Sequence, residues 1–164
     1  MLENFEDIID IVLRAEGGYV NHKYDRGGKT KYGITQKAYP KEDIENLTVE
    51  RAKLLYKRDY WDKYKVGEYP AYLRHIVFDM IVNHGFRTYS YIMQKAVVEY
   101  TNSYIKIDGY AGSKTIEAIK NIKETRGFIY AVRLSRIAMY ESIVSRDRTQ
   151  QVFLLGWIRR GLKV

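Results

Sequence analysis

An amphipathic stretch that ends at two glycines constrains the fold of this chain more than any other feature. Five apolar residues recur at intervals of three and four, which places them on one face of a helix: Phe5, Ile8, Ile9, Val12 and Leu13. Asn4 can cap the start of this helix, and Gly17-Gly18 supply the left-handed backbone that ends one. The chain therefore begins with a helix that packs on a core, and Glu16 lies in its last turn.

The position of Glu16 favours a protonated carboxyl group. Carbonyl groups at the end of a helix lack partners within the helix and form the negative end of its dipole. This field destabilises the carboxylate, so we expect the pKa of Glu16 to be raised, as a general acid requires. A solvated surface acid before a glycine stop is the alternative that this feature alone leaves open.

A second carboxylate follows in a segment without helical periodicity. Residues 19–35 are rich in glycine and predict turns and short strands. Asp25 lies on this loop, and Thr30 follows it. In glycosidases one acid protonates the leaving oxygen while a second carboxylate stabilises the oxocarbenium-like centre, positions water or attacks. We expect Glu16 and Asp25 to form such a pair, with Thr30 holding the water.

The residues of this segment occur in a specific order, which runs Glu16-Gly17-Gly18-Tyr19, Asp25, Gly27-Gly28, Thr30 and Tyr32-Gly33-Ile34-Thr35. In this order the segment resembles the N-terminal motif of glycoside hydrolase family 108, N-acetylmuramidases that occur as phage endolysins and secretion-associated lysozymes. The resemblance implies that Glu16 is the catalytic acid and that Asp25 and Thr30 form an acid–threonine pair resembling that of phage-type lysozymes. His22 and Arg26 depart from the family pattern of an acid and a proline, which alters local charge and loop stiffness.

Two later segments extend the resemblance over nearly the whole chain. Residues 78–85 (FDMIVNHG) look like the family's Asp-x-x-x-Asn-x-Gly helix end, and residues 153–160 (FLLGWIRR) look like its closing segment. Residues 108–115 (DGYAGSKT) predict a turn and a helix capped by Ser113, and they resemble an element of small peptidoglycan-binding modules. A turn followed by a cap is common in unrelated proteins, so a purely structural role stays open for this element.

Helical periodicity predicts three further helices. The first is capped by Thr48 and ends near residues 61–64, the second begins near Pro70 and stops at Gly85, and the third covers residues 128–145. The third is apolar around much of its circumference, which predicts a final, central core helix. Asp79 and Asn83 lie one turn apart on the second helix, where they could bind an acetamido or hydroxyl group. Alternatively, Asp79 anchors a neighbouring backbone group or an arginine.

The tyrosines suggest where a sugar would bind. The chain has 16 of them, and their rings can pack on pyranose C–H groups while the hydroxyl groups form hydrogen bonds. Most are expected in the core or at its rim. Three flank the proposed carboxylates and are the candidates for the cleft: Tyr19, Tyr24 and Tyr32.

Charge and composition limit the classes of function. The net charge is +8, and nine of the basic residues lie between Lys123 and Lys163 against three acids, so this end should bind polyanions. An anionic cell wall is one candidate partner for this basic end. Nucleic acid is another, although the chain has no recognisable motif that reads nucleic acid. A basic helix surface that binds no partner is the third possibility. The absence of cysteine excludes disulfides and a thiol nucleophile, and three scattered histidines predict no metal and no cofactor.

We therefore expect an α+β, mainly α, lysozyme-like fold with a small β element near residues 18–35. Residues 1–90 would form the catalytic lobe, and residues 91–164 a helical peptidoglycan-binding-like lobe packed on it. The N-terminal sequence resembles no signal peptide and no run is long enough to span a membrane, so the protein would be made in the cytoplasm and act on the wall after holin-type or dedicated release.

The expected function is hydrolysis of the β-1,4 bond between N-acetylmuramic acid and N-acetylglucosamine by carboxylic general-acid catalysis. Its partner would be the glycan strand of peptidoglycan, with no nucleic acid, no stable membrane insertion and a monomeric protein. Two alternatives come from other classes: a non-catalytic protein of wall binding or assembly, and a basic nucleic-acid-binding protein.

Overall fold

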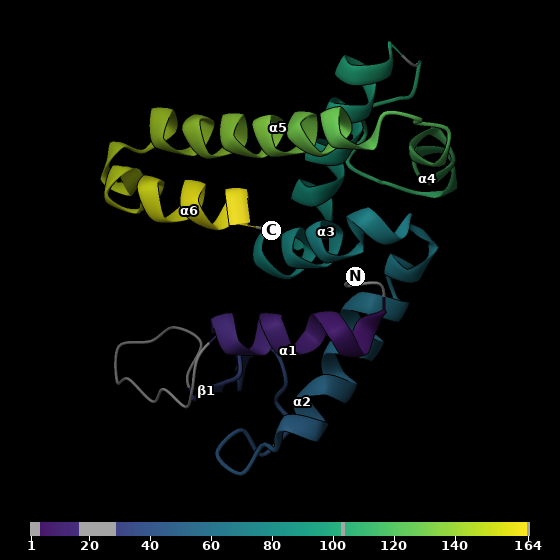
Figure 1. Cartoon of the computed structure of the whole chain (residues 1–164). Coiled ribbons are helices and arrows are strands. Elements are labelled where there is room, and N and C mark those ends of the chain that lie inside the picture. The colour runs from purple at the N-terminus through teal and green to yellow at the C-terminus, as the bar shows by residue number, and fades with distance from the viewer. Residues whose placement is uncertain (1–3, 17–28, 103, 164) are drawn as a thin grey trace. The chain divides into compact units, whose positions relative to one another are not determined.

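The computed structural model describes residues 4–16, 29–102 and 104–163 of the chain (Figure 1). The chain divides into two compact units, Met1–Gly67 and Glu68–Val164, which we call the N-terminal and the C-terminal unit. Helices predominate, and the strands that the described residues form make a single two-stranded sheet. The expected α+β, mainly α class is therefore confirmed.

The N-terminal unit contains α1 (Phe5–Glu16), β1 (Thr30–Lys31), β2 (Ile34–Thr35), α2 (Val49–Tyr56) and a π-helical segment (Lys57–Asp62), and a 3-10 turn (Val66–Glu68) follows it. The apolar stripe of α1 is buried as predicted, with Ile8 and Ile9 fully covered. Both predicted caps form, because Asn4 Oδ1 accepts from the main-chain N–H of Asp7 at 2.9 Å and Thr48 Oγ1 accepts from that of Arg51 at 3.1 Å.

The two strands form a tight antiparallel hairpin. Thr30 pairs with Thr35, and Lys31 pairs with Ile34. The two turn residues both have positive φ, 53° at Tyr32 and 74° at Gly33, as a type I′ turn requires. The hydroxyl group of Tyr56 donates to the carbonyl oxygen of Tyr32 at 3.0 Å, which fixes the hairpin to α2.

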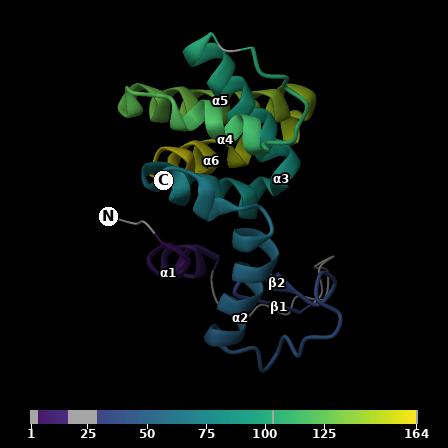
Figure 2. The same cartoon turned by 90° about the vertical axis from the view of Figure 1, so that its right-hand side faces the viewer.

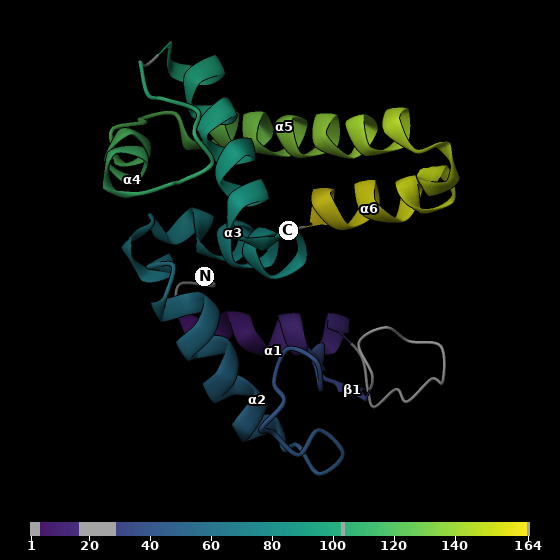
Figure 3. The same cartoon turned by 180° about the vertical axis from the view of Figure 1, so that it is seen from behind.

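The C-terminal unit contains α3 (Ala71–Thr101), α4 (Ser113–Lys120), α5 (Thr125–Arg146), a 3-10 turn (Arg148–Gln150) and α6 (Gln151–Lys163). Helix α5 packs against both α3 and α6. Figures 1 and 3 show α6 running back alongside α5, and α4 contacts α3 (Figure 2). The core of this unit therefore lies where α3, α5 and α6 meet.

The helices of the C-terminal unit differ from prediction in three ways. Gly85 does interrupt α3, with φ 74° and ψ 158°, but the chain resumes a helix directly after this kink. The predicted Ser113 cap was wrong, because the N-cap residue of α4 is Gly112 and no side chain caps the helix. Helix α5 is neither last nor buried all round, since α6 follows it and Leu134 is 66% exposed.

Candidate active site

The end of α1 positions Glu16. The buried stripe fixes this helix in the N-terminal unit, and Glu16 is its last residue. The apolar periodicity and the glycine stop therefore predict the position of this acid. The side chain of Glu16 lies outside what the structure describes, as do Asp25, Tyr19 and Tyr24 entirely. The carboxylate pair and the raised pKa of Glu16 therefore stay predictions.

Thr30 and Tyr32 lie on the hairpin. Thr30 is half-buried at the start of β1, and Tyr32 occupies the first turn position. In the views of Figures 1 and 3, β1 lies below the C-terminal end of α1. A second bond ties the hairpin to the segment before α2, because Lys31 Nζ donates to the carbonyl oxygen of Glu45 at 2.9 Å. A threonine on such a braced strand can orient a water molecule through its hydroxyl group.

Asp79 lies buried in the C-terminal unit and is 3% exposed. Arg136 Nη2 lies 2.8 Å from Asp79 Oδ2, while Arg160 Nη2 lies 3.1 Å from Asp79 Oδ1. Asn83 Nδ2 donates to Asp79 Oδ1 at 3.1 Å and to the carbonyl oxygen of Asp79 at 2.7 Å. These contacts favour the alternative in which Asp79 anchors an arginine over direct binding of a sugar.

The network continues from Arg136 to two further side chains. Its Nε atom donates to Tyr140 Oη at 2.7 Å and lies 3.1 Å from His84 Nε2. Burial, together with the charge of Arg136, lowers the pKa of His84 to about 4, so its imidazole is neutral near pH 7. We call Asp79, Asn83, His84, Arg136, Tyr140 and Arg160 the Asp79 cluster.

The Asp79 cluster joins the two later segments of the family pattern, since Asp79 and Asn83 belong to one and Arg160 to the other. The sequence indicated no role for Arg136 beyond a share in the basic surface, and this was wrong, because the residue is 1% exposed and does not reach a polyanion. The spacing did contain one signal for this role. Arg136 lies four residues from both Val132 and Tyr140, on the same buried face of α5 as Val144, and an arginine on a buried face needs a buried acid.

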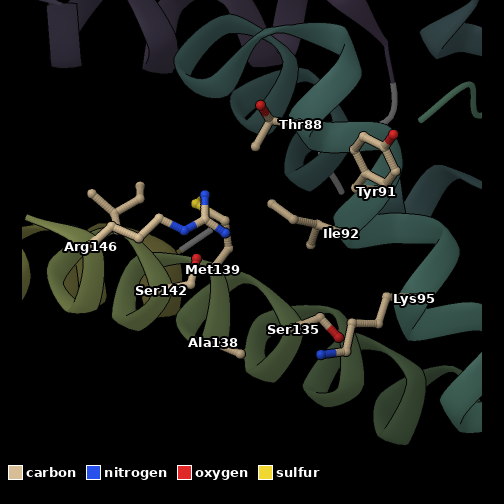
Figure 4. Close-up of a pocket in the computed structure, with 10 residues that line it drawn as sticks. Thr88, Tyr91, Ile92, Lys95, Ser135, Ala138, Met139, Ser142 and Arg146 are labelled. Atoms are coloured by element: carbon tan, nitrogen blue, oxygen red, sulfur yellow. The ribbon is translucent and has the colours of Figure 1, made fainter. Parts of the chain in front are cut away.

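The hollows of the C-terminal unit include two of similar volume. A groove of about 420 Å³ between α3 and α5, which we call the α3–α5 groove, has Ile92 and Met139 in its wall and Lys95 and Arg146 at its ends (Figure 4). No acid is among its lining residues, so it offers no pair for glycoside hydrolysis. The other, of about 480 Å³, adjoins the turn at Asp108 and Gly109.

The part of the chain that the structure describes contains no candidate metal site and no candidate membrane span. In that part of the chain no three histidine or acidic side chains gather closely enough to hold a metal ion. None of the helices described has the length and apolar character that a membrane span requires.

Comparisons with known proteins agree with this architecture. Residues 9–85 match the family model of glycosyl hydrolase 108, and residues 89–162 match a model described as a predicted peptidoglycan domain. The solved structure of SagA from Brucella abortus is similar, with a TM-score of 0.68 and 27% identity over 97% of this chain and 94% of that chain. A search of curated proteins gave no significant match. Residues 9–85 therefore form a glycosyl hydrolase 108 region and residues 89–162 a peptidoglycan-binding region, which together make the protein a lysozyme-like peptidoglycan hydrolase.

Proposed function

We propose that the protein is an N-acetylmuramidase in which Glu16 acts as the general acid. Glu16 gives its proton to the oxygen that leaves when the β-1,4 bond between N-acetylmuramic acid and N-acetylglucosamine breaks. The observation that carries this proposal is the place of Glu16 as the last residue of α1, within the segment that matches glycosyl hydrolase 108. At that end of a helix the dipole favours the protonated acid.

Asp25 and Thr30 complete the proposed chemistry. Asp25 stabilises the positive charge that develops at the anomeric carbon, or orients a water molecule together with Thr30. Thr30 is held by its pairing with Thr35 in the braced hairpin, which keeps its hydroxyl group at a defined position. Tyr19, Tyr24 and Tyr32 pack against the sugar rings. Asp79 and Asn83 hold the helices of the C-terminal unit together through Arg136 and Arg160, so we assign them no direct contact with the glycan.

Residues 1–90 act as the catalytic lobe and residues 91–164 as the lobe that binds the wall. The protein works as a monomer without nucleic acid. It serves cell lysis of the phage endolysin type and reaches the wall through a holin-type pore or a dedicated secretion route.

Release of soluble reducing sugar from purified peptidoglycan tests the role of Glu16. We expect Glu16→Gln to lower the rate by at least about a hundredfold, since general-acid catalysis contributes on that order or more. Glu6→Gln is the matched control, because Glu6 is an exposed glutamate in the first turn of the same helix. Mass spectrometry should find reducing muramic acid ends with wild type. Wild-type protein that binds the wall but releases nothing would leave only a wall-binding function.

Asp25 and Thr30 are tested in the same assay. Asp25→Asn should also reduce the rate strongly, because the positive charge at the anomeric carbon loses its partner. For Thr30→Val we expect a lower kcat, with Thr35→Val as the matched control on the opposite strand. Equal effects of the two valine variants would point to the stability of the hairpin and contradict a role for the Thr30 hydroxyl group. NMR of the first product anomer distinguishes inversion from retention.

A further inference from the structure

The pocket of about 480 Å³ in the C-terminal unit combines aromatic rings with charged side chains. The groups that matter here are Tyr104, Lys106, Asp108, Tyr110 and Lys114. We call this hollow the Tyr110 pocket. It contrasts with the α3–α5 groove, whose lining includes one tyrosine and no acid. Rings beside a carboxylate and two ammonium groups suit a polar ligand that also has an apolar face.

Tyr110 presents an exposed ring that is held in place. The residue is 69% exposed, yet its ring packs edge to face against Phe86 with 5.6 Å between the ring centroids. The main chain of Gly112 also comes close, since a Cβ atom there would lie 2.9 Å from Cε1 of Tyr110. A ring that is already fixed loses little conformational freedom when a ligand stacks on it.

The loop that carries Tyr110 is fixed by the buried amide group of Gln94, which is 2% exposed. Gln94 Nε2 donates to Asp108 Oδ1 at 2.9 Å and to the carbonyl oxygen of Tyr110 at 3.1 Å. Gln94 Oε1 accepts from the N–H groups of Asp108 at 3.1 Å and Gly109 at 3.0 Å. These four hydrogen bonds use the whole amide group, so Gln94 shapes the Tyr110 pocket and leaves the binding to its neighbours.

The charged groups of the pocket match the substituents of a wall sugar. The hydrogen bond from Gln94, followed by that from the Tyr110 N–H, lowers the pKa of Asp108, so its carboxylate stays ionised and accepts from sugar hydroxyl groups. Lys106 and Lys114 stand beside it and can pair with a carboxylate on the lactyl group or on the peptide of muramic acid.

We infer that the Tyr110 pocket binds an N-acetylated hexosamine of the glycan strand, with the sugar stacked on Tyr110 and its hydroxyl groups bonded to Asp108. This inference rests on the proposed function. It adds a glycan site that contains none of the proposed catalytic residues, so that the strand is held at a second point while the hydrolase region works. Two linked sites on one strand raise the effective concentration of each for its part of the glycan.

The test is an NMR titration of the full-length Glu16→Gln protein, in which hydrolysis does not consume the ligand. The probe is chitotetraose, a peptide-free tetramer of N-acetylglucosamine. We expect the amide signals of Gly109, Tyr110 and Gly112 to shift and saturate. Adding Tyr110→Ala should raise the dissociation constant, read from the signals of Gly109 and Gly112, about tenfold, which is the equivalent of a lost stacking contact. Absence of saturable shifts at these amides would overturn the inference.

Matched variants separate the pocket from general surface effects. Tyr130→Ala, in the same Glu16→Gln background, removes a tyrosine that is 62% exposed on α5 and does not line the pocket, so it should leave the dissociation constant unchanged. Tyr110→Phe keeps the ring and should keep the affinity. A similar loss in Tyr130→Ala would contradict a defined site, and so would saturation of the same amides by a stem tetrapeptide but not by chitotetraose.

A second ligand keeps the test decisive if Tyr110→Ala does not fold. Lys114 is exposed, and Lys114→Ala should lower the affinity for a disaccharide muropeptide several-fold and leave the affinity for chitotetraose unchanged. Equal affinity for the muropeptide in both proteins would contradict the role of the lysine. The outcomes also separate the two proposals: saturation without sugar release by wild type would refute the catalytic proposal alone, whereas sugar release without saturation would refute the Tyr110 pocket alone.

Discussion

In the N-terminal unit the described core consists of apolar and aromatic side chains, whereas the core of the C-terminal unit also encloses polar groups. The buried polar and charged residues of the described chain all belong to the C-terminal unit: Asp79, Ser90, Gln94, Thr115, Ser135 and Arg136. The ion pairs of the N-terminal unit, such as Lys53–Asp10 and Arg51–Glu42, lie at its surface. The two units therefore use charge in different ways.

This difference indicates which interactions fix the geometry of each unit. Exposed ion pairs contribute little because water and salt screen them, so the N-terminal unit depends on its apolar stripe and its caps. A buried pair fixes the geometry of the helices that carry it, because either partner alone would be an uncompensated charge. In the C-terminal unit the Asp79 cluster sets how α3, α5 and α6 meet, and Gln94 sets the loop before α4.

The largest effect is expected from breaking the buried ion pair. Arg136→Met leaves Asp79 buried beside one remaining, partly exposed arginine, so we expect the free energy of unfolding to fall by about 3–5 kcal/mol. Urea denaturation followed by circular dichroism measures this loss. Arg51→Met, which breaks an exposed pair of the N-terminal unit, is the control and should change stability little. Similar losses in the two variants would remove the contrast between the units.

The next effect is a pH dependence that originates in the Asp79 cluster. His84 has a pKa of about 4 in the folded protein against about 6.5 unfolded, so the unfolded state binds the proton more tightly. The free energy of unfolding should therefore fall by about 3 kcal/mol as the pH drops from about 6.5 to about 4. Burial lowers the pKa of His75 as well, which adds in the same direction.

Denaturation curves at several pH values, recorded in a His75→Gln background, isolate the contribution of His84. His84→Gln should flatten the dependence in this window, while a steep dependence that survives the substitution would place its origin elsewhere. The titrating imidazole contacts Arg136 and Tyr140, so this pH dependence would originate in the buried cluster of the C-terminal unit.

A smaller effect is expected from the loop that Gln94 holds. Gly109 has φ 77°, and a Cβ atom there would lie 2.6 Å from Cε2 of Tyr91, so Gly109→Ala should cost about 1–3 kcal/mol. Gly156→Ala in α6 is the control, since nothing lies within 4 Å of its Cβ position and alanine is the better helix former. Thermal melting should rank Gly109→Ala below wild type and Gly156→Ala at or above it. The reverse order would show that the loop relaxes.

The smallest effect concerns helix caps. Thr48→Ala removes the bond from Thr48 Oγ1 to the first turn of α2 and should cost about 1 kcal/mol. Ser113→Ala in the C-terminal unit is the matched control, because α4 has no side-chain cap to lose. Urea denaturation of both variants measures the difference. An equal loss in Ser113→Ala would contradict the absence of a side-chain cap on α4.

Much of the fold could be predicted from the sequence because its signals are local. The stripe of α1, its Asn4 cap, the Thr48 cap and the interruption at Gly85 each depend on residues within a turn or two of one another. The prediction of a cap at Ser113 failed because the helix starts one residue earlier than expected, which makes Ser113 its first helical residue and Gly112 the N-cap. The continuation of α3 past Gly85 was missed because a glycine stops one helix without excluding the start of another.

For the candidate site, local signals predicted that Glu16 ends a helix and that the residues around Tyr32 form turns and short strands, since periodicity, glycine placement and turn chemistry act over a few residues. The pairing of Thr30 with Thr35 came from the structure. Tertiary packing, which no local signal predicts, pairs Asp79 with Arg136 and with Arg160, 81 positions away, and lets Gln94 shape the Tyr110 pocket. The physical reason is that burial changes what a polar residue needs. A charge that water would solvate anywhere on the surface must find a partner inside, and the packing of helices selects that partner.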